Sequence, residues 1–169
     1  VMRFLPEIFG RDITFIRMDR SYRSTVEIMT YAESVLGGGS ELNSVERHGE
    51  TPGILAACSE EEEMRLLSEG LRELKDCHTQ AVITRDAKSA QSMSDRLKEL
   101  GVDAVLLTKD SMKFRPGISV LPFYLAKGLE FDAVHIPDVQ KYTNSLDKQA
   151  LYIGATRALH VLKLYSLSK

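Results

Sequence analysis

Cysteine and long apolar runs are both scarce in this chain. Cys58 and Cys77 are its two cysteines, and no signal-like segment opens the chain, so the sequence predicts reduced thiols and no disulfide. No apolar run approaches the ~20 residues that a bilayer-crossing helix needs. We therefore expect a soluble, cytoplasmic protein without a membrane partner.

An excess of charge of either sign is also lacking. The formal net charge is -2 and the isoelectric point is near 6.1, whereas a free-standing nucleic-acid binder normally carries a basic excess. Contact with DNA or RNA is therefore expected to be local or shared with other domains.

A chain of 169 residues can bury a sizeable core and favours one domain. It begins at Val1 rather than at a methionine, which favours a segment of a longer polypeptide.

Common phosphate and metal motifs are missing. No Gly-x-x-x-x-Gly-Lys-Ser/Thr loop occurs, so no segment is predicted to cradle phosphates with backbone amides. No apolar strand ends in Asp-Glu to hold Mg²⁺; residues 136–138, Ile-Pro-Asp, come nearest and are not predicted to bind metal. The four histidines share no ligand spacing and neither cysteine belongs to a Cys-x-x-Cys pair, which excludes a zinc site. The acidic run 60–63 fits the first turn of a helix, and we expect it to be a solvated face.

Hydrophobic periodicity predicts alternating strands and helices. The expected strands are residues 13–18, 54–58, 79–84, 102–107, 117–121, 131–136 and 159–165. A helix follows each of the first three strands, and a fourth helix lies within residues 146–158. Residues 37–53 are interpreted as a long loop. The alternation predicts a three-layer α/β domain, with helices on both faces of a mainly parallel sheet.

Polar side chains mark where three of these helices begin. The expected caps are Ser24 with Glu27, Ser59 with Glu62, and Asp86 alone. Gly70 falls inside the second helix and predicts a modest loss of helix stability.

Three polar segments contain residue types that suit a nucleotide. Arg157, an arginine held at a helix start, can make forked hydrogen bonds to a phosphoryl group, and Glu130, a carboxylate where a strand begins, suits a sugar hydroxyl. Tyr22 and Arg23 could stack on a base and reach a phosphate at the carboxyl end of a strand, where open α/β sheets bind ligands. Taken singly, each segment has an ordinary structural explanation. Arg157 can be a solvated or salt-bridged arginine, Glu130 can belong to a turn before a strand, and residues 21–24 can be a plain loop.

Together and in this order, the segments resemble one family. The chain looks like the second RecA-like motor domain of superfamily 1 helicases, the UvrD, Rep and PcrA group, and particularly its HelD-like branch. Residues 18–24, Met-Asp-Arg-Ser-Tyr-Arg-Ser, resemble motif IV, whose usual core is Asn-Tyr-Arg-Ser. Residues 120–131 resemble motif V, and residues 151–158 resemble motif VI, Leu-Tyr-Val-Ala-x-Thr-Arg-Ala. The resemblance spans nearly all of residues 1–169 and implies a single C-terminal RecA-like domain of the P-loop NTPase type.

The resemblance implies a role in ATP binding or hydrolysis for residues of these motifs. Two arginines would contact the γ-phosphate: Arg23 and Arg157. Four more residues would shape the nucleotide site: Tyr22 against the adenine or ribose, Gly128 by letting the backbone come close, Glu130 at a ribose hydroxyl, and Thr156 by positioning the second arginine. Lys127 would connect the nucleotide cleft with the DNA-facing side.

Two departures from the family pattern concern DNA contact and motif IV. The UvrD-type motif V has a Thr-x-His pattern that helps to hold single-stranded DNA, whereas Pro122 and Tyr124 stand at the matching positions. Tyr124 could stack on a base, but the phosphate-facing hydroxyl is absent. Ser21 replaces the usual Asn of motif IV, a small polar exchange that is expected to leave Tyr22 and Arg23 in place.

The resemblance predicts the C-terminal domain of an ATP-dependent DNA helicase or translocase, supplying one wall of an ATP cleft. An N-terminal motor domain of the same polypeptide would carry the phosphate loop and the Mg²⁺ ligands, so the isolated chain is expected not to hydrolyse ATP. Single-stranded DNA would be a partner, and RNA polymerase another if the protein is HelD-like. The alternatives are a stand-alone remnant that binds a nucleotide or a partner without catalysis, and a flavodoxin-like regulatory domain, which the missing acidic cluster disfavours.

Overall fold

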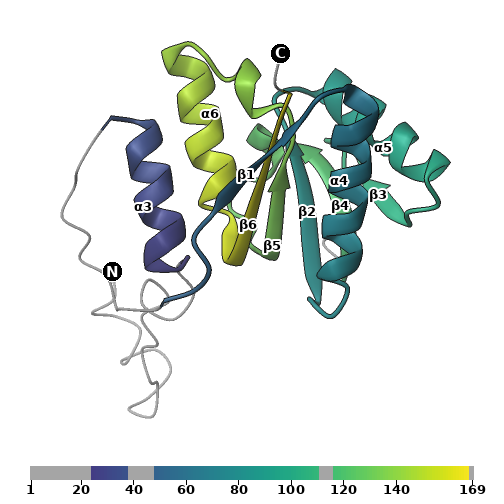
Figure 1. Cartoon of the computed structure of the whole chain (residues 1–169), viewed down its shortest axis with the longest axis horizontal. Coiled ribbons are helices and arrows are strands. Elements are labelled where there is room, and N and C mark those ends of the chain that lie inside the picture. Colours follow the sequence, from purple (N-terminus) through teal and green to yellow (C-terminus); the bar gives the residue numbers. More distant parts are fainter. Residues whose placement is uncertain (1–23, 38–47, 111–115, 168–169) are drawn as a thin grey trace, which may run out of the picture.

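The computed structural model describes residues 24–37, 48–110 and 116–167, along which strands and helices alternate (Figure 1). In chain order the elements are α3 (Val26–Val35), β1 (Gly53–Ala57), α4 (Glu60–Glu73), β2 (Thr79–Thr84), α5 (Ala87–Glu99), β3 (Ala104–Leu106), β4 (Gly117–Pro122), the short 3-10 helix η1 (Phe123–Leu125), β5 (Phe131–Ile136), the 3-10 helix η2 (Val139–Lys141), α6 (Ser145–Ala155) and β6 (Ala158–Leu167). The strand expected at residues 13–18 lies outside the described residues, as does much of the loop expected at 37–53. The other strands expected from the sequence are present.

The six described strands form one parallel sheet, in the order β1-β6-β5-β2-β4-β3. Every residue of β2, near the centre, is buried because helices cover both faces of the sheet there. β1 is an edge strand, and its apolar residues Ile54 and Leu55 are exposed. The mainly parallel sheet predicted from the sequence is confirmed.

Helices cover the two faces of the sheet in pairs (Figure 1). Ala81 and Ile83 of β2 belong to a core shared with α3 and α6, whereas Val82, between them, belongs to the core under α4 and α5. Successive side chains of a strand point to opposite faces, so one strand contributes to both cores. The predicted three-layer α/β architecture is therefore confirmed.

Capping side chains set where α4 and α5 begin, as predicted. Ser59 accepts a hydrogen bond from the backbone N–H of Glu62 at 3.1 Å, and Asp86 accepts one from the N–H of Ser89 at 2.7 Å. The Glu62 carboxylate reaches back to the N–H of Cys58 at 2.6 Å. These bonds satisfy N–H groups that have no partner within the helix.

The start of α3 differs from the prediction. Thr25, rather than Ser24, is its N-cap and accepts from an N–H of the first turn at 3.3 Å. The Glu27 carboxylate accepts from the N–H of Gly49 at 2.9 Å and lies 2.8 Å from Nδ1 of His48. These two contacts, that of Gly49 first, lower the pKa of Glu27. The predicted capping box is wrong because both of its side chains have partners elsewhere in the fold.

A buried polar row crosses the sheet under α4. His135 lies between Gln80, whose Oε1 is 2.8 Å from Nε2, and Tyr165, whose hydroxyl oxygen is 2.8 Å from Nδ1. All three side chains are buried, and burial lowers the pKa of His135 to about 3, so its ring is neutral. Gln80 also donates to two carbonyls at the end of α4, both at 3.0 Å. The row therefore ties three strands to this helix.

The helix expected within residues 146–158 is α6, which ends at Ala155 with Thr156 as its C-cap, and Ala158 already belongs to β6. β3 is shorter than the strand expected at residues 102–107. β3 begins at Ala104 because the N–H of Val102 still bonds to the last turn of α5, at 2.9 Å.

No helix among the described residues is both long and apolar enough to cross a membrane.

Candidate functional site

The ends of the three polar segments meet at the amino ends of β5 and β6. Glu130 directly precedes β5, and Arg157 directly precedes β6. The N–H of Phe131 donates to the Arg157 carbonyl at 2.9 Å and so joins the two turns. Ser24 belongs to the same place, because its hydroxyl donates to the carbonyl of Thr156 at 3.2 Å. Residues 132 positions apart in the sequence are thus brought into one site.

α6 carries Arg157 to this edge of the sheet. Asn144 is the N-cap of this helix, and its side chain accepts from an N–H of the first turn at 2.7 Å. Gly154 faces the sheet, where a β-carbon would lie 3.2 Å from Ile83 and 3.4 Å from Ile136. The glycine therefore lets α6 pack closely on β2 and β5, and this close packing sets the position of the turn that follows.

Arg157 lies just past the C-terminal end of α6, so its expected position at a helix start is wrong. Its Nε donates to the carbonyl of Ile153 at 3.2 Å, and Nη2 donates to Oγ1 of Thr156 at 3.3 Å. The Thr156 hydroxyl in turn donates to the Ile153 carbonyl at 3.0 Å. A cation suits this end of a helix because the last carbonyls carry partial negative charge.

Much of the Arg157 guanidinium makes no hydrogen bond to the described residues. A guanidinium has five N–H donors, of which two take part in the bonds just described. In the parts of the chain that the structure describes, no carboxylate forms an ion pair with Arg157, and the side chain is half-buried. Its remaining donors form a planar fork of the kind that binds a phosphate.

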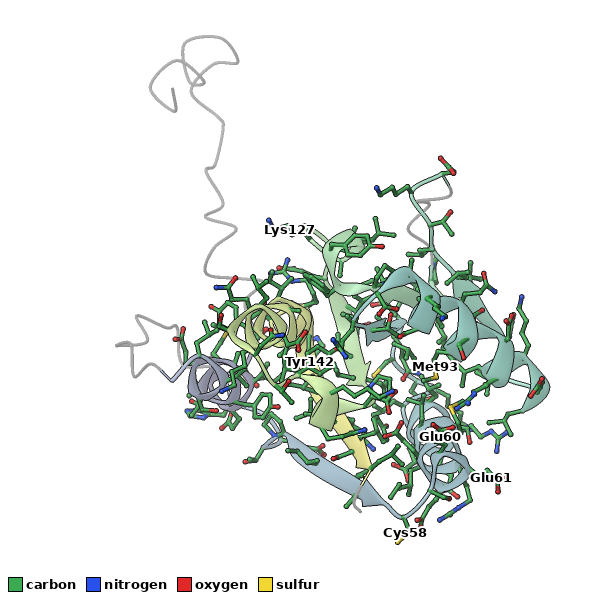
Figure 2. All side chains as sticks on the ribbon, turned by 90° about the horizontal axis from the view of Figure 1, so that it is seen from above. Cys58, Glu60, Glu61, Met93, Lys127 and Tyr142 are labelled. Carbon is green, nitrogen blue, oxygen red and sulfur yellow. The ribbon has the colours of Figure 1, made fainter. Side chains whose placement is uncertain are left out.

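Residues 123–130 carry the chain from one edge of the sheet to the other. β4 ends at the carboxyl edge, and Glu130 comes at the amino edge. Gly128 has a φ of 82°, which glycine adopts without strain. A β-carbon there would meet open space, so the backbone conformation, rather than crowding within the chain, requires glycine. Lys127 and Glu130 are exposed, and Figure 2 shows Lys127 projecting away from the body of the protein.

Tyr124 lies at the opposite edge of the sheet from Glu130. It belongs to η1, directly after β4, and is 42% exposed. Its ring packs edge-on against Phe123, with the centroids 5.6 Å apart. A hollow of about 330 Å³ beside it is lined by α5 and the ends of β3 and β4. Tyr124, which is expected to contact nucleic acid, is therefore separated by the length of the strands from the residues that are expected to contact the nucleotide.

Most of motif IV cannot be placed in this site. Tyr22 and Arg23 lie outside the described residues, and Ser24 is the one motif IV residue within them. The sequence placed this segment at the carboxyl end of a strand. That strand, expected at residues 13–18, lies outside the described residues, so the placement stays a prediction. Ser24 itself lies at the amino end of β6. The reason is that α3 packs along α6, with its start beside the end of α6.

The sequence did not predict a second hollow, at the carboxyl ends of β2 and β5. It has a volume of about 360 Å³ and is lined by α4, α5 and the turn after β5; Glu60 and Tyr142, two of its lining residues, are labelled in Figure 2. Glu63 also lines it and is only 4% exposed. The expectation of a solvated face for residues 60–63 is therefore wrong at Glu63, which shares the inner face of α4 with Leu67.

The environment of Glu63 favours its protonated form. Burial, and after it a hydrogen bond and the negative charge of Asp138, raise the pKa of Glu63 to about 7. Its Oε2 has no hydrogen-bond partner among the described residues. Asp138 has a φ of 56°, a conformation that Asp tolerates better than most residues. No group of three His, Cys, Asp or Glu side chains suited to a metal ion occurs in the described ranges.

Two family models match adjoining parts of the chain. One matches residues 16–116 and the other residues 117–165, and both represent the UvrD-like helicase C-terminal domain. The first alone covers more than half of the chain. The two matched ranges include all three segments that resemble helicase motifs, whereas the HelD-like branch stays a prediction.

Solved structures give a second comparison. The crystal structure of the C-terminal domain of a possible DNA helicase from Lactobacillus plantarum WCFS1 matches with a TM-score of 0.73 and 28% identity, over 87% of this chain and 88% of that one. This match confirms the predicted RecA-like fold. A complex of Arterivirus nonstructural protein 10, a helicase, with DNA has a TM-score of 0.46 and 14% identity, over 68% of this chain and 28% of that one. No curated protein matches the chain in sequence.

Proposed function

This chain belongs to the UvrD-like helicase C-terminal domain family, and on that premise we propose that it forms one wall of an ATP-binding cleft in a superfamily 1 DNA helicase or translocase. The observation that carries the proposal is the meeting of Glu130, Arg157 and the end of motif IV at one edge of the sheet. Residues so far apart in the sequence can act on one ligand only if the fold gathers them. Here two of them precede neighbouring strands.

Arg157 would stabilise the γ-phosphate as charge develops on it during hydrolysis. Its bonds to Ile153 and Thr156 hold the guanidinium in one orientation before any ligand arrives. A donor that is already oriented needs little rearrangement in the transition state, which is the basis of electrostatic catalysis. Arg23 precedes Ser24 in the sequence and is proposed as the second arginine of the same wall.

The turn before β5 would contact the rest of the nucleotide. Glu130 is exposed, so its carboxylate is accessible to a ribose hydroxyl. Gly128 has open space where a side chain would stand, which lets the backbone approach the nucleotide. Tyr22 would pack against the adenine or the ribose and complete the wall.

Mg²⁺ would enter the cleft with ATP rather than bind to this chain. In this proposal the ligands of Mg²⁺ and the phosphate loop belong to an N-terminal motor domain of the same polypeptide, as the helicase resemblance implies. When bound, MgATP supplies the phosphoryl group that is transferred to water. The residues of this chain would bind the nucleotide, orient it and stabilise its charge.

Motif V would couple the two edges of the sheet. Tyr124 at the carboxyl edge is exposed and can stack on a base of single-stranded DNA, while Glu130 faces the nucleotide at the amino edge. Lys127 lies between them in the same segment. Closure of the cleft on ATP and its reopening after hydrolysis would then move the DNA contact by small steps.

The HelD-like resemblance adds RNA polymerase as a proposed partner, which co-purification with that enzyme tests.

Replacement of Arg157 tests the proposal in a protein that contains both motor domains. We expect Arg157→Ala to lower kcat for ATP by at least about 100-fold, since an arginine on the transferring phosphate contributes this much or more. The melting temperature should change little. Arg65→Ala is the matched control, because Arg65 is exposed on α4 and, among the residues that the structure describes, forms ion pairs only with Glu62 and Glu69 of the same helix.

Two results would count against the proposal. One is an ATPase rate of Arg157→Ala equal to that of Arg65→Ala. The other is magnesium-dependent ATP hydrolysis by the isolated chain, which is expected to be inactive without the second wall.

A further inference from the structure

Ser24 holds the backbone on both sides of Arg157. Its hydroxyl donates to the carbonyl of Thr156 at 3.2 Å and also contacts the carbonyl of Ala158. These carbonyls flank Arg157 in the sequence. A hydroxyl has one hydrogen, so the bond is shared between the two carbonyls and holds them together.

The carbonyl between these two is held as well. The Arg157 carbonyl accepts from the N–H of Phe131 at 2.9 Å, so three successive carbonyls of the turn bond to motif IV or motif V. Peptide groups are planar, and fixing consecutive carbonyls leaves little rotation about the Arg157 backbone. The direction of the Arg157 Cα–Cβ bond is set in consequence.

The Ser24 hydroxyl is not needed to begin α3. Thr25 caps that helix with its own side chain, although the sequence favoured Ser24 for this task. The Ser24 side chain is therefore free to bond across 132 residues to the turn after α6. Its role lies in the contact between the segments rather than in local helix stability.

We infer that Ser24 is a positioning residue, which fixes the turn that carries Arg157. The inference rests on the proposed function, since it concerns an arginine assigned to the γ-phosphate.

Hydrogen exchange in the full chain of 169 residues tests the positioning directly. We expect Ser24→Ala to speed exchange of the Phe131 amide, because the Arg157 carbonyl that it bonds to becomes mobile. Ser24→Thr keeps the hydroxyl and should leave exchange near the wild-type rate. Ser34→Ala is the matched control, since the Ser34 hydroxyl donates to the Tyr31 carbonyl within α3. Unchanged exchange in Ser24→Ala overturns the inference, whatever the ATPase assay shows.

Kinetics in the protein with both motor domains give the second test. Loss of one hydrogen bond to the turn should lower kcat about tenfold in Ser24→Ala, with little change in KM because Arg157 acts in the transition state. Ser24→Thr should restore kcat. The double variant Ser24→Ala with Arg157→Ala should be no slower than Arg157→Ala alone, because Ser24 acts through that arginine.

The two proposals fail in different ways. Full activity of Arg157→Ala contradicts the proposed function, and exchange at Phe131 then still decides whether Ser24 holds the turn. A slow Arg157→Ala beside a fully active Ser24→Ala overturns the positioning role alone. So does a double variant whose losses multiply.

Discussion

Gly70 and Tyr165 are in such close contact that α4 has no room for a side chain where it crosses β6. A β-carbon on Gly70 would overlap the Tyr165 hydroxyl and come 3.5 Å from the ring of His135. The sequence suggested only that a glycine within a helix lowers its stability. The packing shows a compensating reason for it: the glycine makes space for the buried row of Gln80, His135 and Tyr165.

We predict that Gly70→Ala destabilises the protein, although alanine is the better helix former. Tyr165 is fully buried and its ring is rigid, so the overlap can be relieved only by moving α4 or breaking the bond to His135. The free energy of unfolding should fall by about 1–3 kcal/mol, as for other overpacked cores. Urea denaturation of the chain measures it.

A double-mutant cycle separates this overlap from other effects of the alanine. Tyr165→Phe removes the hydroxyl and should by itself lower stability by about 1 kcal/mol, because His135 loses a partner. In that background Gly70→Ala should cost less than in the wild type. Equal costs in the two backgrounds would refute the steric explanation.

Glu63 should make stability depend on pH. Its pKa is raised in the folded state to about 7 from the ordinary value of 4.5, so the folded protein binds a proton more tightly than the unfolded chain. The contribution is fully present below pH 4.5 and is lost as the pH rises through about 7. We expect thermal melts of Glu63→Gln, a neutral side chain of the same shape, to lack this decline.

The comparison needs a control because other groups also titrate. His135 acts in the opposite sense: its pKa is lowered to about 3 from 6.5, so its contribution is lost as the pH falls below 6.5. Glu61→Gln removes an exposed carboxylate from the same turn of α4 and should keep the wild-type slope. If Glu63→Gln and Glu61→Gln have parallel pH profiles, Glu63 is not the source of the decline.

Tyr124 should contribute to binding of single-stranded DNA in the protein with both motor domains. Stacking of a base on an aromatic side chain supports a loss of about tenfold in affinity for Tyr124→Ala. Fluorescence anisotropy with a labelled oligonucleotide, at one fixed salt concentration, measures the change. Tyr124→Phe keeps the ring and should bind as the wild type does; a defect as large as that of Tyr124→Ala would point to the hydroxyl instead of stacking.

Elements that depend on near neighbours in the sequence were predicted well. β2 and β5 have the predicted bounds, and Asp86 caps α5 as expected. Apolar periodicity and a capping side chain involve residues within about four positions of one another, so a single sequence contains the whole signal. The resemblance to UvrD-like helicases also came from the sequence, and both family models confirm that family.

The misplaced residues share a dependence on distant partners. Ser24 and Glu27 had the spacing of a capping box, but each bonds to a segment that only the fold brings near. Glu63 belonged to an acidic run, and its burial depends on α5 and on the turn after β5 lying against α4. Such contacts leave no mark in the local pattern of residue types.

Arg157 and Glu130 illustrate which features the sequence determined and which features the fold determined. The sequence by itself determined that a guanidinium stands where a helix is followed by a strand, and that a carboxylate stands where a turn is followed by a strand. Both places follow from hydrophobic periodicity. Only the tertiary structure decided that both junctions lie at the amino edge, on adjacent strands, with Arg157 past a helix end and Ser24 beside it. The physical reason is that strand order and helix docking are set by burial of the two cores, which sums contacts over the whole chain.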